Sequence, residues 1–146
     1  MDCNTGDMME NPLTCTIDAD ISAIPSVSLA LDKTMRAHGF SEEECLDTQL
    51  AVEEAVTNVI LHGYAEIPGQ IQITCHVTPH FAEVQILDSA APFNPLTIPE
   101  PDVTEEIEER QIGGLGIFLI RRVMDEVSYR YDDGHNILVL IKKKNI

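Results

Sequence analysis

The segment from Ser41 to Gly63 constrains the fold more than any other part of this chain, because it carries a nearly complete set of helix signals. Ser41 followed three residues later by Glu44 has the spacing of a capping box, in which each side chain bonds the backbone N–H of the other residue. Acidic residues directly after the cap suit the positive end of the helix dipole. The pattern predicts a helix that begins after Ser41, runs through Leu61 and ends at Gly63.

Runs with strand-like alternation flank this helix and predict a sheet. Two further helices are expected, one from Pro25 to about His38 and one from the glycine run at 113–116 to Asp125. The expected strands cover residues 13–17, 70–77, 82–87, 127–131 and 136–141. The fold class predicted is α+β: a two-layer α/β sandwich with helices packed on one face of a mostly antiparallel mixed sheet.

The chain has the length of one domain, at 146 residues. Residues 1–12 are polar and acidic and are expected to form a flexible leader, so that the domain spans residues 13–146. The leader lacks the regions of a signal peptide, and no apolar run reaches the roughly 20 residues that cross a membrane. A cytoplasmic protein is therefore expected, with its four scattered cysteines reduced and neither bound to zinc nor paired as disulfides.

The charge is strongly negative: 9 Lys and Arg stand against 25 Asp and Glu, for a net charge of −16. Such a field repels phosphates, which argues against direct binding of nucleic acid. It favours a basic protein partner, although solubility alone explains it equally well.

One side of the predicted central helix combines small and polar side chains. Glu54 and Asn58 are one turn apart and therefore neighbours. An Asn oxygen is a suitable ligand for Mg²⁺, and a carboxylate beside it is suited to take a proton from a hydroxyl that attacks a phosphoryl group. The competing interpretation is a plain solvated face, which this helix alone favours. With residues about 100° apart, the apolar arc holds Leu46, Leu50, Val52, Val56, Val59, Ile60 and Leu61, and the other arc holds Ala51, Glu54, Ala55, Asn58 and His62.

Two further features suggest a nucleotide. Gly113-Gly114-Leu115-Gly116 stands directly before a predicted helix, where free N–H groups and the dipole favour a phosphate. A hinge is an equally good explanation of the glycines, and the spacing excludes a P-loop. Asp88 ends a predicted strand, where its carboxylate is suited to accept a hydrogen bond from the exocyclic amine of adenine. Ordinary turn initiation also explains an aspartate there.

Taken together and in this order, the three features resemble the boxes of the GHKL ATPase superfamily. The similarity is greatest to the anti-sigma-factor serine kinases of bacterial partner-switching systems, and it covers roughly residues 13–146. The N box corresponds to residues 50–58 with His62-Gly63-Tyr64, the first glycine box to residues 88–95, and the second to residues 113–120 and on to 124–127.

This resemblance implies a GHKL ATPase-like fold that binds ATP with Mg²⁺ and transfers the γ-phosphoryl group to a Ser or Thr of an anti-anti-sigma partner. It further implies a possible sigma-factor partner, a possible homodimer, and an ATP lid over residues 96–112. Glu54 would be the general base and Asn58 the Mg²⁺ ligand, and the nucleotide would contact Asn58, His62, Asp88, Phe93, Gly113, Gly114, Leu115 and Gly116.

Two departures from the family pattern motivate a second hypothesis. Ala90 stands where the first box usually has glycine, and four glutamates between residues 105 and 109 make the expected lid acidic, with Arg110 as its nearby cation. Both would weaken ATP binding. The alternative is a non-catalytic, nucleotide-responsive module that sequesters a sigma factor or another regulatory protein. A third hypothesis, the ATPase half of a histidine kinase, requires a separate partner with the phosphorylated histidine.

Overall fold

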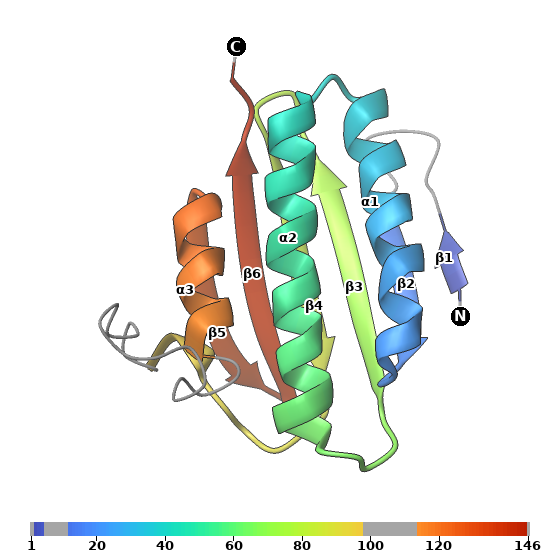
Figure 1. Cartoon of the computed structure of the whole chain (residues 1–146), viewed down its shortest axis with the longest axis vertical. Coiled ribbons are helices and arrows are strands. Elements are labelled where there is room, and N and C mark those ends of the chain that lie inside the picture. Colours follow the sequence, from blue (N-terminus) through green and yellow to red (C-terminus); the bar gives the residue numbers. More distant parts are fainter. Residues whose placement is uncertain (1, 5–11, 98–113, 146) are drawn as a thin grey trace.

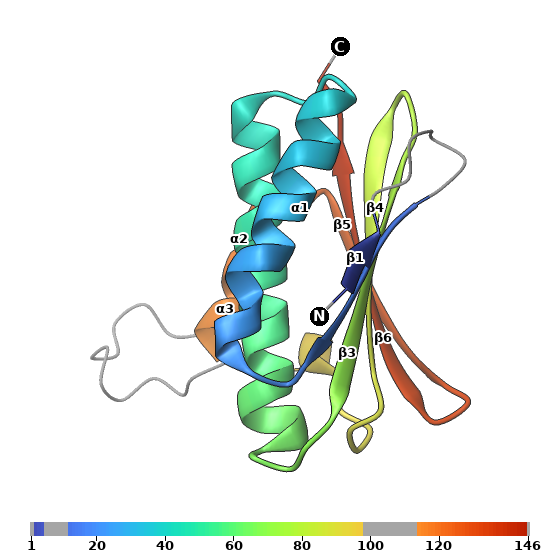
Figure 2. The same cartoon turned by 90° about the vertical axis from the view of Figure 1, so that its right-hand side faces the viewer.

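The computed structural model describes residues 2–4, 12–97 and 114–145. In this part of the chain the α-helices cover one face of a single sheet, as the two views show (Figure 1, Figure 2). The predicted two-layer sandwich is therefore confirmed. The helices are α1 (Ile24–Ala37), α2 (Glu42–Asn58) and α3 (Gly114–Val123).

Within the described residues the sheet has six strands in the order β1-β2-β3-β4-β6-β5. Every described pair of neighbours is antiparallel, so the expected parallel component is not found among them. The strands are β1 (Asp2–Asn4), β2 (Leu13–Asp18), β3 (Gln70–Val77), β4 (Phe81–Asp88), β5 (Glu126–Asp132) and β6 (His135–Lys143).

The core lies between the helices and the inner face of the sheet. Side chains alternate along β3 and β4, so every second residue is buried, as expected for strands with one covered face. Asp88 falls on the inward register of β4, which is unusual for a carboxylate. The inward residues of these strands are Ile71, Ile73, Cys75 and Val77 on β3, and Ala82, Val84, Ile86 and Asp88 on β4.

The capping box of α2 is present as predicted. The Glu44 N–H donates to Ser41 Oγ at 3.1 Å, and the Ser41 N–H donates to Glu44 Oε1 at 2.7 Å. The second oxygen, Glu44 Oε2, accepts the N–H of Asn145 at 2.6 Å, so this cap also holds the end of the described chain.

The faces of α2 differ from the helical-wheel prediction. Leu46, Leu50 and Leu61, expected on the apolar arc, are 53%, 37% and 40% exposed, whereas Ala51 and Ala55 are buried. The small side chains lie on the buried side because they let the helix approach the sheet closely. A wheel shows where apolar residues cluster, but it cannot show which side of the helix meets the sheet.

The end of the central helix is also different. The α-helix ends at Asn58 and continues as a π-helical turn over Val59–Tyr64, closed by Ala65 in the left-handed region at φ 51°. Gly63 therefore lies inside the turn and does not end it. The Tyr64 hydroxyl donates to the Gln70 carbonyl at 2.7 Å, a tertiary contact that holds this wider turn in place.

The N-terminal segment corrects two expectations. Asp2–Asn4 pair with β2, so this part of the expected leader is a strand; residues 5–11 lie outside the described residues. The register places Cys3 opposite Cys15, with Cα atoms 4.0 Å apart, and they form a disulfide. The expectation of four reduced cysteines was therefore wrong for this pair, because a cross-strand register cannot be read from cysteine spacing. Cys45 and Cys75 are free and buried.

Among the helices of the described residues, none has both the length and the apolar character needed to span a bilayer.

Candidate functional site

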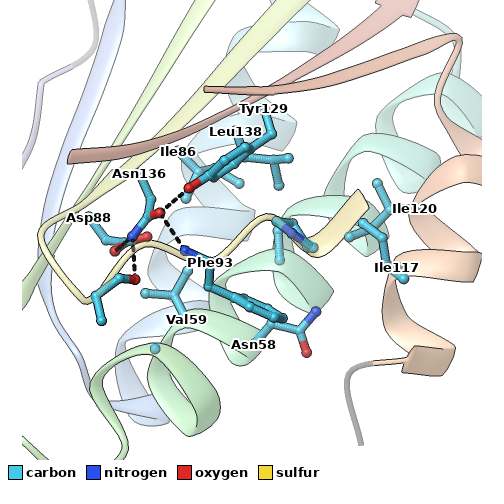
Figure 3. Close-up of a pocket in the computed structure, with 14 residues that line it drawn as sticks. Asn58, Val59, Ile86, Asp88, Phe93, Ile117, Ile120, Tyr129, Asn136 and Leu138 are labelled. Carbon is cyan, nitrogen blue, oxygen red and sulfur yellow. Dashed lines mark hydrogen bonds between the residues drawn. The ribbon is translucent and has the colours of Figure 1, made fainter. Parts of the chain in front are cut away.

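A pocket opens between helices α2 and α3, the inner face of the sheet and the loop that follows β4 (Figure 3). Its walls are mostly apolar, with Ile117 and Ile120 from α3 and Ile86 and Leu138 from the sheet. The polar side chains among its described lining residues are Asn58, Asp88, Tyr129 and Asn136.

Two of these polar groups are placed by strand register. Asp88 is the last residue of β4 and pairs with Asn136 on β6, and both side chains point inward. They are only 5% and 6% exposed. Buried polar groups need hydrogen-bond partners, and this pair supplies one between its own side chains.

Asn136 is the centre of a hydrogen-bond network (Figure 3). Its Nδ2 donates to Asp88 Oδ1 at 2.9 Å and lies 3.2 and 3.1 Å from the carbonyl oxygens of Ala90 and Ala91. Its Oδ1 accepts the N–H of Phe93 at 3.1 Å and also the Tyr129 hydroxyl. The loop after β4 is thus tied to the β5–β6 hairpin at several points.

The Asp88 carboxylate is occupied on one oxygen only. Oδ1 accepts from Asn136 and also from the Ala90 N–H at 2.9 Å, whereas Oδ2 accepts no hydrogen bond from the described residues. An acceptor in an apolar pocket suits a ligand with an N–H donor.

Tyr129 completes the polar end of the pocket. Burial raises the pKa of its hydroxyl, and the nearby Asp88 charge raises it further. The hydroxyl is therefore protonated at neutral pH and available as a donor to Asn136.

The predicted catalytic pair lies on α2, and one of its two members lines the pocket. Asn58 is the last residue of α2, is half-buried and lines the pocket. Glu54, one turn earlier, is also half-buried but does not line it. His62 lies in the π-helical turn, is exposed and is not among the lining residues.

The glycine run is partly described. Gly113 lies outside the described residues, and Gly114, Leu115 and Gly116 form the first turn of α3. Ile117, the next residue, lines the pocket. The start of α3 is therefore close to the pocket, as a phosphate-binding helix N-terminus requires. Most of the expected lid, residues 98–112, lies outside the described residues, as does Arg110.

Ala90, which stands where the family pattern has glycine, does not crowd the pocket. Ala90 is buried but is not one of the pocket's lining residues. Its methyl group faces Gly63, where an added Cβ would lie 3.3 Å away. Phe93, in contrast, lines the pocket and is 45% exposed.

Sequence reasoning missed Tyr129 and Asn136. The signal for Asn136 was a polar residue in phase with the buried Leu138 and Leu140, on a strand whose inward positions are otherwise apolar. Tyr129 gave no comparable signal, because its role follows from pairing with Leu138 in the hairpin.

The described residues thus form an antiparallel sheet that helices cover on one face, with a pocket at the end of the strand that carries the inward-facing Asp88. Residues 17–142 match the family described as the histidine kinase-like ATPase domain, and the chain belongs to this family. The resemblance predicted from the three boxes is thereby confirmed.

Within this family, the chain is similar to proteins named serine-protein kinase RsbW. The chain is 32% identical to the serine-protein kinase RsbW of Listeria innocua over 136 residues, which cover 90% of this chain and 87% of that protein. It is 27% identical to the serine-protein kinase RsbW of Bacillus mycoides over 127 residues, covering 84% and 79%.

A solved structure shows the same fold. The crystal structure of RsbU and RsbW domains from Mycobacterium tuberculosis matches with a TM-score of 0.65 at 19% identity. The match covers 93% of this chain and 33% of that longer chain.

Proposed function

We propose that this protein is an ATP-dependent serine/threonine kinase that phosphorylates a small regulatory partner of the anti-anti-sigma type and thereby acts as an anti-sigma-factor-like regulator. The observation that carries the proposal is the Asp88 carboxylate, with one oxygen unoccupied by the described residues, at the end of an apolar pocket whose α2 side holds Asn58. The relatives named serine-protein kinases support the same activity.

The pocket chemistry suits an adenine base. Asp88 Oδ2 is an acceptor for the exocyclic amine of adenine, whereas guanine would present a carbonyl oxygen at the same position. Ile86, Ile120 and Leu138 supply flat apolar contact on the sheet and α3 sides. The pocket has a volume of about 40 Å³, room for only a few water molecules. Entry of a base therefore requires lining side chains to move, and Phe93 is the large apolar lining residue with the greatest exposure.

The residues on α2 suit phosphoryl transfer. Asn58 offers a neutral oxygen ligand for Mg²⁺, which when bound neutralises charge on the phosphates. Glu54, on the preceding turn and partly open to solvent, would accept the proton of the attacking Ser or Thr hydroxyl. Backbone N–H groups at the start of α3 would hold the phosphates.

The partner is expected to offer a basic surface, because the chain carries a net charge of −16. Sequestration of a sigma factor fits the same charge and is the second activity proposed. Because the Ala90 methyl group faces Gly63 and Ala90 is not part of the pocket lining, the motive for a non-catalytic module is weaker.

Two measurements test the proposal. Calorimetry with ATP and Mg²⁺ should show binding, and a ligand at 100 times its Kd should stabilise the fold by about 2.7 kcal/mol. Radiolabelled ATP should then transfer its γ-phosphoryl group to a small anti-anti-sigma domain. Binding without transfer to any such partner favours the non-catalytic module, and absence of ATP binding refutes both.

A further inference from the structure

We propose that Asn136, supported by Tyr129, is a positioning residue that determines base selectivity by fixing the Asp88 carboxylate. The inference rests on the proposed function, since selectivity requires that a nucleotide bind in this pocket.

Asn136 has little capacity left to bind a ligand itself. A side-chain amide has two N–H donors and one oxygen with two lone pairs. The donors are taken by Asp88 Oδ1 and the carbonyl oxygens of Ala90 and Ala91. The lone pairs are taken by the Phe93 N–H and the Tyr129 hydroxyl. Asn136 therefore acts through the residues that it holds.

The orientation of the amide is determined by its neighbours. Phe93 presents a backbone N–H, which can only donate, so Asn136 Oδ1 must face it. The opposite side of the amide meets Asp88 Oδ1 and two carbonyl oxygens, all of which accept. A flipped amide would leave donor facing donor and acceptor facing acceptor. This network therefore has one favourable arrangement.

The network restricts the orientation of the Asp88 carboxylate. Its Oδ1 is held by two donors at 2.9 Å, from Asn136 and from the Ala90 backbone, so the carboxylate cannot rotate freely. Oδ2 is left as the acceptor for a ligand N–H. Asp88 is only 5% exposed, so its buried negative charge is stabilised by the hydrogen bonds that it accepts. Loss of the Asn136 donor would remove one of these hydrogen bonds. Without Asn136 the carboxylate would turn to find another donor.

Tyr129 in turn supports Asn136 through a hydrogen bond. It is opposite Leu138 in the β5–β6 hairpin, and its hydroxyl donates to Asn136 Oδ1, the same oxygen that accepts the Phe93 N–H (Figure 3). Removal of this single oxygen frees one lone pair on Asn136 but leaves the Phe93 and Asp88 bonds intact. Its effect should therefore be smaller than the effect of replacing Asn136.

The test compares two ligands that differ only in the exocyclic amine: ATP and purine riboside triphosphate, both with Mg²⁺. Calorimetry gives Kd for each on wild type, Asn136→Leu, Tyr129→Phe and the control Tyr131→Phe. Tyr131 is on the same strand and lies opposite Asn136 in the hairpin, but it is 46% exposed, and no hydrogen bond among the described residues joins its hydroxyl to Asn136. A hydrogen bond to a charged group predicts that wild type binds ATP about tenfold more tightly than the analogue. Asn136→Leu should bring this ratio close to one, Tyr129→Phe should lower it partly, and Tyr131→Phe should leave it unchanged.

The ratio of the two Kd values distinguishes a positioning role of Asn136 from a general structural role. If Asn136→Leu weakens both ligands equally and keeps the wild-type ratio, Asn136 is only structural and the inference is wrong. If that variant does not fold, an unchanged ratio in Tyr129→Phe overturns the inference and a lowered ratio supports it. Wild type that binds ATP and the analogue equally overturns the inference, because Asp88 then selects no base, but leaves nucleotide binding intact. Wild type that binds neither ligand refutes the proposed function.

Discussion

Tyr64 and Ser89, 25 positions apart, are joined by a hydrogen bond of 2.9 Å from the Ser89 N–H to the Tyr64 hydroxyl. The same hydroxyl donates to the Gln70 carbonyl. One side chain thus connects the π-helical turn after α2, the start of β3 and the loop after β4. The first and last of these contribute to the pocket wall, so Tyr64 holds two sides of the site at a set separation.

Tyr64→Phe should lower the free energy of unfolding by about 1–2 kcal/mol, because it removes two partly buried hydrogen bonds to the backbone. Urea denaturation measures the change. Tyr131→Phe, on an exposed side chain, is the control and should have little effect. A Tyr64→Phe variant as stable as wild type would show that water replaces the hydroxyl.

Gly69→Ala should destabilise the fold by steric conflict. A Cβ at Gly69 would lie 2.2 Å from Cε1 of Tyr64, and the backbone there is not in the left-handed region. Overpacking of this kind costs roughly 1–3 kcal/mol. Gly63→Ala is the matched comparison, since its Cβ would lie 3.3 Å from the Ala90 methyl and should cost less. Equal melting temperatures for the two variants would contradict the expectation.

The capping box should make stability depend on pH. Burial alone would raise the pKa of Glu44, but hydrogen bonds from the Ser41 and Asn145 backbone N–H groups lower it overall from the ordinary 4.5. A lowered folded pKa means that the stabilisation is present above pH 4.5 and is lost as the pH falls through the folded value.

Glu44→Gln should therefore be less stable than wild type at pH 7, by about 1 kcal/mol, and the difference should shrink as the solution becomes acidic. Denaturation curves across the acid range measure this. Glu43→Gln, on an exposed neighbour in the same helical turn, should show no such convergence. A constant difference at every pH would exclude the charge of Glu44 as the cause.

Glu54→Gln should lower phosphoryl transfer at least about 100-fold, the contribution expected of a general base, while Kd for ATP changes little because Glu54 does not line the pocket. Single-turnover transfer and calorimetry separate the two effects. The neighbouring Glu53→Gln is the control. Transfer at the wild-type rate would remove Glu54 from the mechanism.

Much of the fold was predictable from local patterns. The capping residues Ser41 and Glu44, the alternation along β3 and β4, and the turn residues between β5 and β6 each act over a few positions, and each predicted element is present. The order of the three boxes also predicted the family, because the order and spacing of motifs can be read directly from the sequence and do not depend on how the chain packs.

The site was only partly predictable. Asn58, Asp88 and Phe93 do line one pocket, but His62 does not, and Tyr129 and Asn136 were not anticipated. The exposed Leu46 and Leu50 and the buried Ala51 and Ala55 depart from the expected faces of α2, although Val52 and Val56 are buried as expected. Each of these differences depends on which surfaces meet, and periodicity within one helix or strand carries no information on that choice.

The amino-acid sequence by itself determined most of the helices and strands, the α+β sandwich that they form, and membership of the histidine kinase-like ATPase family. Tertiary structure decided the Asn136 network, the disulfide between Cys3 and Cys15, and the Tyr64 bridge. The physical reason is sequence separation. Caps and alternation act between residues a few positions apart, whereas the Cys3–Cys15, Tyr64–Ser89 and Asp88–Asn136 contacts join residues 12 to 48 positions apart, whose meeting depends on strand register and packing.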